Sequence, residues 1–162
     1  NDFFKIPETL IKKEFSRIMS LKDGLKKMSK SEISDLSRIN LTDTKDQIIN
    51  KIKKAKTDPL PMPSTIDDIN KRPEAKNLIG IYSSLADLKL EETINKFSGK
   101  NFSEFKENLI EVLIDKIIPI SVEIKKLLDD KNYLDEILLD GSKKAEDIAS
   151  KKIKKIHKIL DF

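Results

Sequence analysis

The sequence predicts a mainly α-helical protein, with an antiparallel C-terminal helical bundle over residues 44–162. Apolar residues recur at helical spacing through most of this range. Glycine is scarce, at 4 residues, and 37% of the residues are charged, which is typical of solvated helices. Residues 1–43 show no sustained apolar period, and Pro7 and Gly24 interrupt them, so they form a separate segment.

The sequence of the first half of the bundle, residues 44–99, predicts three helices. Asp43 or Thr44 is suited to cap the first, whose core face holds Ile48, Ile49, Ile52 and Ala55. Residues 58–72 are expected to be a connecting loop, because three prolines lie between 59 and 63. Pro73 suits the first turn of the second helix, whose core face holds Leu78, Ile79, Tyr82 and Leu85. A short third helix near 90–97 ends at Ser98-Gly99.

The second half predicts a long helix over about 103–129, with a kink at Pro119. A short helix follows and places Tyr133 toward the core, and Gly141 is expected to end it. Ser142 would then cap the last helix, whose inward face holds Ala145, Ile148, Ala149, Ile153, Ile156 and Leu160.

Composition excludes several classes of function. The chain has 0 cysteines, which excludes disulfides and thiolate metal sites. Its 1 histidine, His157, lies near a helix end without a nearby acidic or thiol partner, so no metal site is expected. No apolar run approaches membrane-spanning length, so no membrane partner is expected. A net charge of +4 permits nucleic-acid binding without requiring it.

The most informative stretch is Lys27-Met28-Ser29-Lys30-Ser31. It matches the KMSKS signature loop of class I aminoacyl-tRNA synthetases at every position. Two lysines on such a loop can follow the negative charge that builds on leaving phosphates, and small hydroxyl residues let the backbone approach them. Taken alone, so short a pattern also fits a solvated Lys/Ser turn.

The flanking sequence resembles bacterial and mitochondrial tryptophanyl-tRNA synthetases. The resemblance runs through most of the chain, in order: 17–26, 52–58, 72–78, 81–85, 97–102, 105–106, 133–138, 141–145 and 148–149. An HIGH-type motif, the partner signature of this class, would need a histidine far upstream of His157. The chain is therefore expected to be the C-terminal part of a longer enzyme.

The resemblance implies two domains. Residues 1–43 would be the remnant of an α/β Rossmann-like catalytic domain, carrying a late strand and the KMSKS loop, and residues 44–162 an anticodon-binding type of helical domain. It implies ATP-dependent activation of tryptophan and its transfer to tRNA(Trp), with ATP and Mg²⁺ as the substrate complex. The full-length enzyme is expected to be a cytoplasmic homodimer that takes part in protein biosynthesis. This chain alone is not expected to be active.

The same resemblance suggests site residues. Lys27 and Lys30 would be catalytic, and the ATP-binding residues would be Ile18, Lys27, Met28, Ser29, Lys30 and Ser31, with Ile18 beside the adenine. Lys151, Lys152 and Lys155 lie on a basic stripe of the last helix, which fits either a tRNA backbone contact or an ordinary solvated helix face. Three alternatives stay open: a tyrosyl-tRNA synthetase-like enzyme, a non-catalytic helical tRNA-binding module, and a helical interaction protein with an accidental motif.

Overall fold

The computed structural model describes residues 3–11 and 16–161. The secondary structure of these residues is α-helical apart from one short 3₁₀ turn and one isolated β-bridge. By compactness the chain divides into two units, residues 1–120 and 121–162. The mainly α class is confirmed. The expected domain boundary at 43/44 stays a prediction, and the segment that precedes it packs against the helices that follow it.

The first helix, α1 (Lys45–Lys53), begins where the sequence predicts. Thr44 is its N-cap: the Thr44 hydroxyl accepts from the Gln47 amide, and the Gln47 side chain accepts from the Thr44 amide. Ile48 and Ile52 are fully buried and Ala55 nearly so, while Ile49 is half-buried. This capping box fixes the start of the helix, and the apolar stripe fixes the face that it buries.

The expected loop at 58–72 is wrong in one part, because α2 (Ile66–Asn70) lies within it. The Thr65 hydroxyl caps this helix by accepting from the Asp68 amide, and Ile69 is fully buried. The three prolines end before Thr65, so they do not oppose a single turn at that point. A turn this short gave too few periodic positions to be recognised.

The next two helices agree with the prediction. Helix α3 (Pro73–Ala86) starts with its proline in the first turn, and α4 (Leu90–Phe97) ends before Gly99, which has φ +70°. Tyr82 is buried, and its ring packs edge-on against Phe97 at 4.9 Å between centroids.

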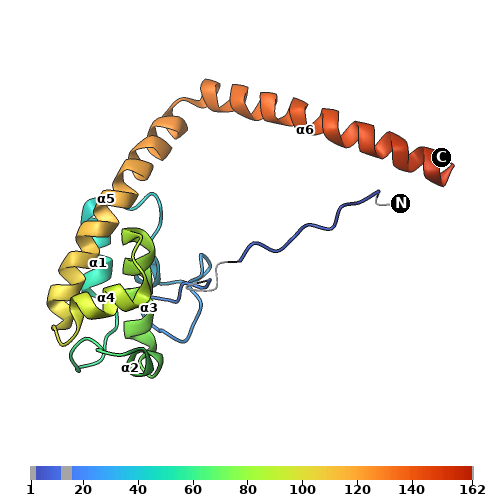
Figure 1. Cartoon of the computed structure of the whole chain (residues 1–162). Helices are drawn as coiled ribbons and strands as arrows, with labels where there is room; N and C mark the ends of the chain where they lie inside the picture. The colour runs from blue at the N-terminus through green and yellow to red at the C-terminus, as the bar shows by residue number, and fades with distance from the viewer. Residues whose placement is uncertain (1–2, 12–15, 162) are drawn as a thin grey trace. The chain divides into compact units, whose positions relative to one another are not determined.

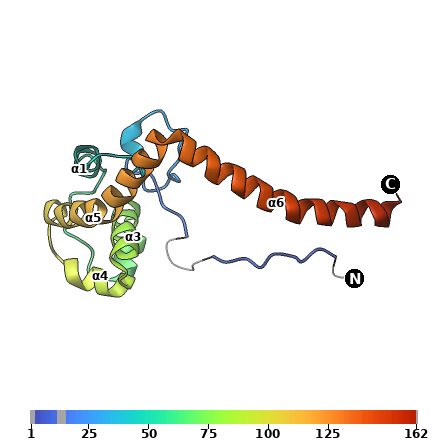
Figure 2. The ribbon, with the colours of Figure 1, turned by 90° about the horizontal axis from the view of Figure 1, so that it is seen from above.

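Helix α5 (Phe102–Asp129) runs through Pro119, as expected, instead of ending there. Its residues up to Ile120 belong to the first unit, where Phe105, Leu109 and Leu113 complete the core built by α1, α3 and α4. Figures 1 and 2 show this part of α5 lying among those three helices. The apolar face of this helix is therefore part of the shared core of the first unit.

Helix α6 (Lys131–Leu160) corrects the prediction for the end of the chain. It is one continuous helix with Gly141 inside it, capped at its start by the Asp130 carboxylate, and Figure 1 shows it without a break. One glycine costs only about 1 kcal/mol relative to alanine in a helix interior, which flanking helix formers can offset. Tyr133, expected in the core, is 50% exposed. Five of the six residues of the expected inward face are exposed as well, namely Ala145, Ile148, Ala149, Ile153 and Leu160, and Ile156 is half-buried.

The strand expected in residues 1–43 does not form in the described residues. A single antiparallel bridge joins Met19 to Lys27, and a 3₁₀ turn spans Asp35–Ser37. A strand needs partner strands for its backbone groups, and the described residues supply none. The segment instead binds the helices through side chains.

Candidate nucleotide-binding loop

The motif loop, Lys27–Ser31, begins within a short paired base, because Lys27 is bridged to Met19. The Ser20 amide donates to the Lys26 carbonyl at 2.8 Å, and the Met28 amide donates to the Ile18 carbonyl at 3.0 Å. Lys27 and Lys30 are exposed, and Met28 is half-buried. The base therefore fixes where the loop leaves the protein, while both ammonium groups stay in solvent and free to meet an anion.

The two serines of the motif loop interact with each other. Their hydroxyl groups lie 2.9 Å apart, and the Ser31 amide donates to the Ser29 hydroxyl at 3.3 Å. A serine side chain that bonds to the backbone two residues on is a local turn device. The two serines thus give the loop a preferred turn, while Met28 packs against the hydrophobic core.

Asn77 of α3 holds the segment that precedes the motif loop. Its side-chain oxygen accepts from the Met19 amide, and its side-chain nitrogen donates to the Met19 carbonyl, both at 2.8 Å. Asn77 is buried, so these bonds form away from solvent. The amide side chain does here what a neighbouring strand would do in a sheet, and it fixes the backbone next to Ile18.

Ile18 lines a cavity in the first unit. The cavity has a volume of about 560 Å³, and Ile18 shares its wall with Arg17, Met19, Asn70, Lys76 and Leu90, among others. Ile18 is half-buried. Its expected place beside the adenine stays a prediction.

A second, smaller cavity lies under the motif loop. Its volume is about 250 Å³, and its walls include Lys22, Lys26, Lys27 and Ser29, with Asp23 and Glu32 also present. Ser37 lines it too, and its hydroxyl group is buried without a hydrogen-bond partner. Lys26 lies 3.8 Å from the Asp23 carboxylate, so the lining combines an internal ion pair with further lysines.

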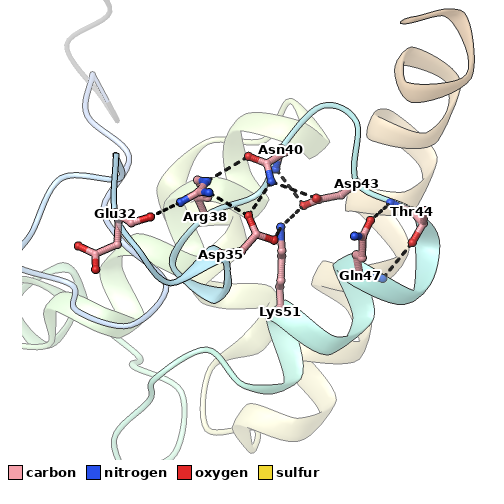
Figure 3. A network of polar contacts seen from close by, with 8 residues as sticks. All are labelled: Glu32, Asp35, Arg38, Asn40, Asp43, Thr44, Gln47 and Lys51. Atoms are coloured by element: carbon pink, nitrogen blue, oxygen red, sulfur yellow. Dashed lines mark hydrogen bonds and ion pairs between the residues drawn. The ribbon is translucent and has the colours of Figure 1, made fainter. Parts of the chain in front are cut away.

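The segment after the motif loop is tied to α1 by an anchor network, which consists of Asp35, Arg38, Asn40, Asp43 and Lys51 (Figure 3). The Arg38 guanidinium donates to the Glu32 carbonyl at 2.8 Å and pairs with the Asp35 carboxylate at 3.1 Å. Lys51, only 2% exposed, places its Nζ 2.7 Å from Asp35 Oδ2 and 2.6 Å from Asp43 Oδ2. The ammonium group therefore joins two carboxylates of the connecting segment to the buried face of α1.

Asn40 completes the anchor network. Its side-chain nitrogen donates to both carboxylates, to Asp35 Oδ1 at 3.0 Å and to Asp43 Oδ1 at 3.1 Å. The hydrogen bonds from Lys51 and Asn40 lower the pKa of Asp35 below its ordinary value. Every charged member thus has an opposite partner, which is the arrangement that a buried ion requires.

The predicted tRNA-contacting lysines lie on α6. Lys151 and Lys155 are exposed and Lys152 is half-buried, and positions three and four residues apart share one face of a helix. Their role stays a prediction. In the described residues, 3–11 and 16–161, no three histidine, cysteine or acidic residues gather as they would around a metal ion. None of the helices described there has the length and apolarity to cross a membrane.

Sequence reasoning missed Asn77 and the anchor network. One signal was available for Lys51: it lies three residues after Ile48 and one before Ile52, so a charged residue occupies the apolar stripe of α1. A charge at such a position predicts a buried partner. Arg38 gave no comparable signal, because its partners depend on how the connecting segment folds.

The residues of the motif loop, Lys27–Ser31, point to the class I aminoacyl-tRNA synthetases. The family model of class I tRNA synthetases (W and Y) matches residues 1–116, and the chain belongs to this family. Among relatives, the tryptophan–tRNA ligase of Agrobacterium fabrum is 46% identical over 160 residues, covering 99% of this chain and 45% of that protein. The tryptophan–tRNA ligase of Rickettsia felis is 48% identical over 161 residues, covering 99% and 48%.

Solved structures show the same fold. The tryptophanyl-tRNA synthetase of Mycoplasma pneumoniae aligns with a TM-score of 0.76 at 22% identity, over 93% of this chain and 45% of that one. The Campylobacter jejuni enzyme, solved with ADP and tryptophan, aligns with a TM-score of 0.68 at 22% identity, over 99% and 48%. The chain thus spans about half the length of the curated relatives and solved proteins that it matches.

Proposed function

We propose that this chain is the C-terminal part of a tryptophan–tRNA ligase, which activates tryptophan with ATP and transfers it to tRNA(Trp). The observation that carries the proposal is the motif loop, with exposed Lys27 and Lys30 above an anchored base. The family includes tyrosine enzymes as well. Tryptophan is favoured because the relatives at 46% and 48% identity, which match almost the whole chain, are tryptophan–tRNA ligases.

In this reaction a carboxylate oxygen of tryptophan attacks the α-phosphorus of ATP, and the bond to the bridging oxygen of pyrophosphate breaks. Negative charge grows on the leaving pyrophosphate. Lys27 and Lys30 are suited to stabilise that charge, because both side chains are exposed to solvent and carry an ammonium group. Mg²⁺ enters with ATP as part of the substrate and shares the phosphate charge.

The remaining residues of the proposed ATP site have supporting roles. Ile18 would pack on the adenine from the wall of the 560 Å³ cavity. Met28, Ser29 and Ser31 would shape the loop so that its backbone approaches the phosphates. Asn77 would keep Ile18 in place through the Met19 backbone.

The test uses the full-length enzyme that carries this chain. Lys27→Ala and Lys30→Ala should each slow tryptophanyl-adenylate formation by roughly 100- to 1,000-fold, the usual effect of losing one charge-stabilising donor. Tryptophan affinity should change little. Lys45→Ala, an exposed lysine at the start of α1, is the matched control and should leave the rate unchanged. Normal pre-steady-state adenylate formation in both motif variants would contradict the assignment.

We propose further that α6 contacts the phosphate backbone of the tRNA anticodon arm through Lys151, Lys152 and Lys155. Changing all three to Gln keeps helix propensity and should weaken tRNA binding. The slope of log K against log salt should fall by somewhat less than 1 unit per lost phosphate contact. The control changes Lys45, Lys53 and Lys54, three exposed lysines at α1, to Gln. If both triple variants bind like wild type, α6 carries only a solvated face.

The proposal includes a homodimeric full-length enzyme working in the cytoplasm, where tRNA is charged for protein synthesis. The support is the relationship to bacterial tryptophan–tRNA ligases. Light scattering of the purified full-length enzyme tests the dimer, and a monomer at working concentration would contradict it. A non-catalytic tRNA-binding module is the second candidate, and it requires that the full-length protein bind tRNA without forming an adenylate.

A further inference from the structure

We propose that Arg38 and the anchor network position the motif loop, so that α1 sets the distance between the loop lysines and the phosphates. This inference rests on the proposed function. The members of the anchor network are positioning residues. Arg38, for example, binds the Glu32 carbonyl, Asp35 and Asn40, which belong to the segment that follows the loop.

Arg38 binds the backbone at the end of the motif loop. Glu32 directly follows Ser31, and its carbonyl accepts from the Arg38 guanidinium at 2.8 Å. The same guanidinium donates to the Asn40 side-chain oxygen at 3.2 Å and pairs with Asp35 at 3.1 Å. Three contacts hold the planar group in one orientation, so the Glu32 carbonyl has a fixed position.

A backbone hydrogen bond connects the two sides of the motif loop. The Leu21 amide, before the loop, donates to the Ser37 carbonyl, after it, at 2.9 Å. Ser37 ends the 3₁₀ turn that begins at Asp35. The turn that contributes Asp35 to the anchor network therefore also binds the incoming segment, and the loop has both of its ends on one support.

The buried side chain of Lys51 makes that support rigid. Lys51 is almost fully buried beside Ile48 and Ile52, both of which are fully buried in the core of the first unit. Its Nζ binds Asp35 and Asp43 at 2.7 and 2.6 Å. A displacement of Asp35 would thus require moving a core residue or leaving a buried cation short of one partner.

The consequence concerns the geometry of the chemical step. Charge stabilisation depends on position, and a displacement of about 1 Å can lower a rate by about 100-fold. Loss of Arg38 would leave Lys27 and Lys30 present but no longer held at the required place. The predicted signature is a slower adenylate step with unchanged tryptophan binding.

The experiment uses the full-length enzyme and compares Arg38→Ala with Arg72→Ala. Arg72 is the matched control because it makes contacts of the same kind: it pairs with Asp58 at 2.7 Å and donates to the Pro61 carbonyl. It is buried, whereas Arg38 is half-buried, and its side-chain hydrogen bonds and ion pairs go to residues 58–68 and not to the motif loop. Per folded active site, Arg38→Ala should slow adenylate formation by about 10- to 100-fold, and Arg72→Ala by less than about 2-fold. Equal rates in the two variants would overturn the proposal.

A conservative variant and a measurement without substrate separate an orienting role of Arg38 from a general loss of activity. Arg38→Lys retains the positive charge but loses the planar guanidinium with its several donors. The rate of adenylate formation in this variant should therefore lie between those of wild type and Arg38→Ala. A rate equal to that of Arg38→Ala is evidence against an orienting role. Hydrogen exchange of the amides in residues 27–34 needs no substrate and should accelerate in Arg38→Ala only. Unchanged exchange there refutes the anchor even if the wild-type enzyme proves not to activate tryptophan, which would refute the proposed function separately.

Discussion

The buried ion pair of the anchor network gives the sharpest stability prediction. Lys51→Met keeps the apolar stem of the side chain and removes only the ammonium group. Asp43, whose side chain is 4% exposed, then loses its cation at 2.6 Å. Removing one partner of a buried pair costs about 3–5 kcal/mol, because the other charge remains buried.

The remaining contacts set the expected value within that range. Asp43 keeps two hydrogen bonds from Asn40, one from its amide at 2.9 Å and one from its side chain at 3.1 Å. The Asp35 side chain is 50% exposed, so water can replace the contact that it loses. These contacts place the expected loss near the lower limit, at about 3 kcal/mol, which is a large share of the stability of an ordinary domain.

The assay is urea unfolding of the protein, followed by circular dichroism and by tyrosine fluorescence. Tyr82 lies in the core of the first unit, so its signal reports on the unit that contains Lys51. Lys100→Met is the control, because Lys100 is 41% exposed and pairs with Glu104 on the surface. That control should cost less than about 1 kcal/mol.

A second substitution tests the mechanism itself. Adding Asp43→Asn to Lys51→Met removes the stranded charge, so the double variant should be less destabilised than the sum of the two single variants, by roughly 1–2 kcal/mol. Additive losses, or a loss under about 1 kcal/mol in Lys51→Met alone, would refute the reasoning from a buried pair.

Three other predictions follow from separate features. Gly24→Ala should destabilise the protein by about 1–3 kcal/mol in urea unfolding, because the added Cβ would lie 2.6 Å from the Glu74 amide nitrogen. Gly141→Ala should instead raise the stability of α6, because its Cβ would have no atom within 4 Å and alanine favours the helix. Burial raises the pKa of Asp58, but its hydrogen bonds, chiefly the one from Arg72, have the larger effect, so the pKa lies below its ordinary value. The hydrogen bond from Lys56 likewise lowers the pKa of Glu74. A lowered pKa stabilises the fold above the ordinary value and loses that contribution as pH falls, so stability should drop below about pH 4, and less steeply in Asp58→Asn and Glu74→Gln. The 162-residue chain alone should not catalyse tryptophan-dependent ATP–pyrophosphate exchange, since it spans only about half of its relatives, and exchange above a no-enzyme control would disprove this.

The sequence by itself determined the features that depend on local chemistry. Thr44 and Gln47 form a capping box from residues three apart, and Pro73 occupies a first turn that needs no amide donor. The order of letters in Lys27–Ser31, with its flanks, identified the family, because a signature loop is contiguous in the chain.

The tertiary structure decided what depends on distant partners. Asn77 lies 58 residues from the Met19 backbone that it holds, and Lys51 reaches back to Asp35 and Asp43 from inside the apolar stripe of α1. Gly141 stays helical because the helix propensity of glycine is only about 1 kcal/mol less favourable than that of alanine. The helical turns that continue on both sides of it in α6 offset this cost. Propensity and capping act over a few residues, whereas the support of the motif loop arises from which side chains the fold brings together, and no local pattern records that.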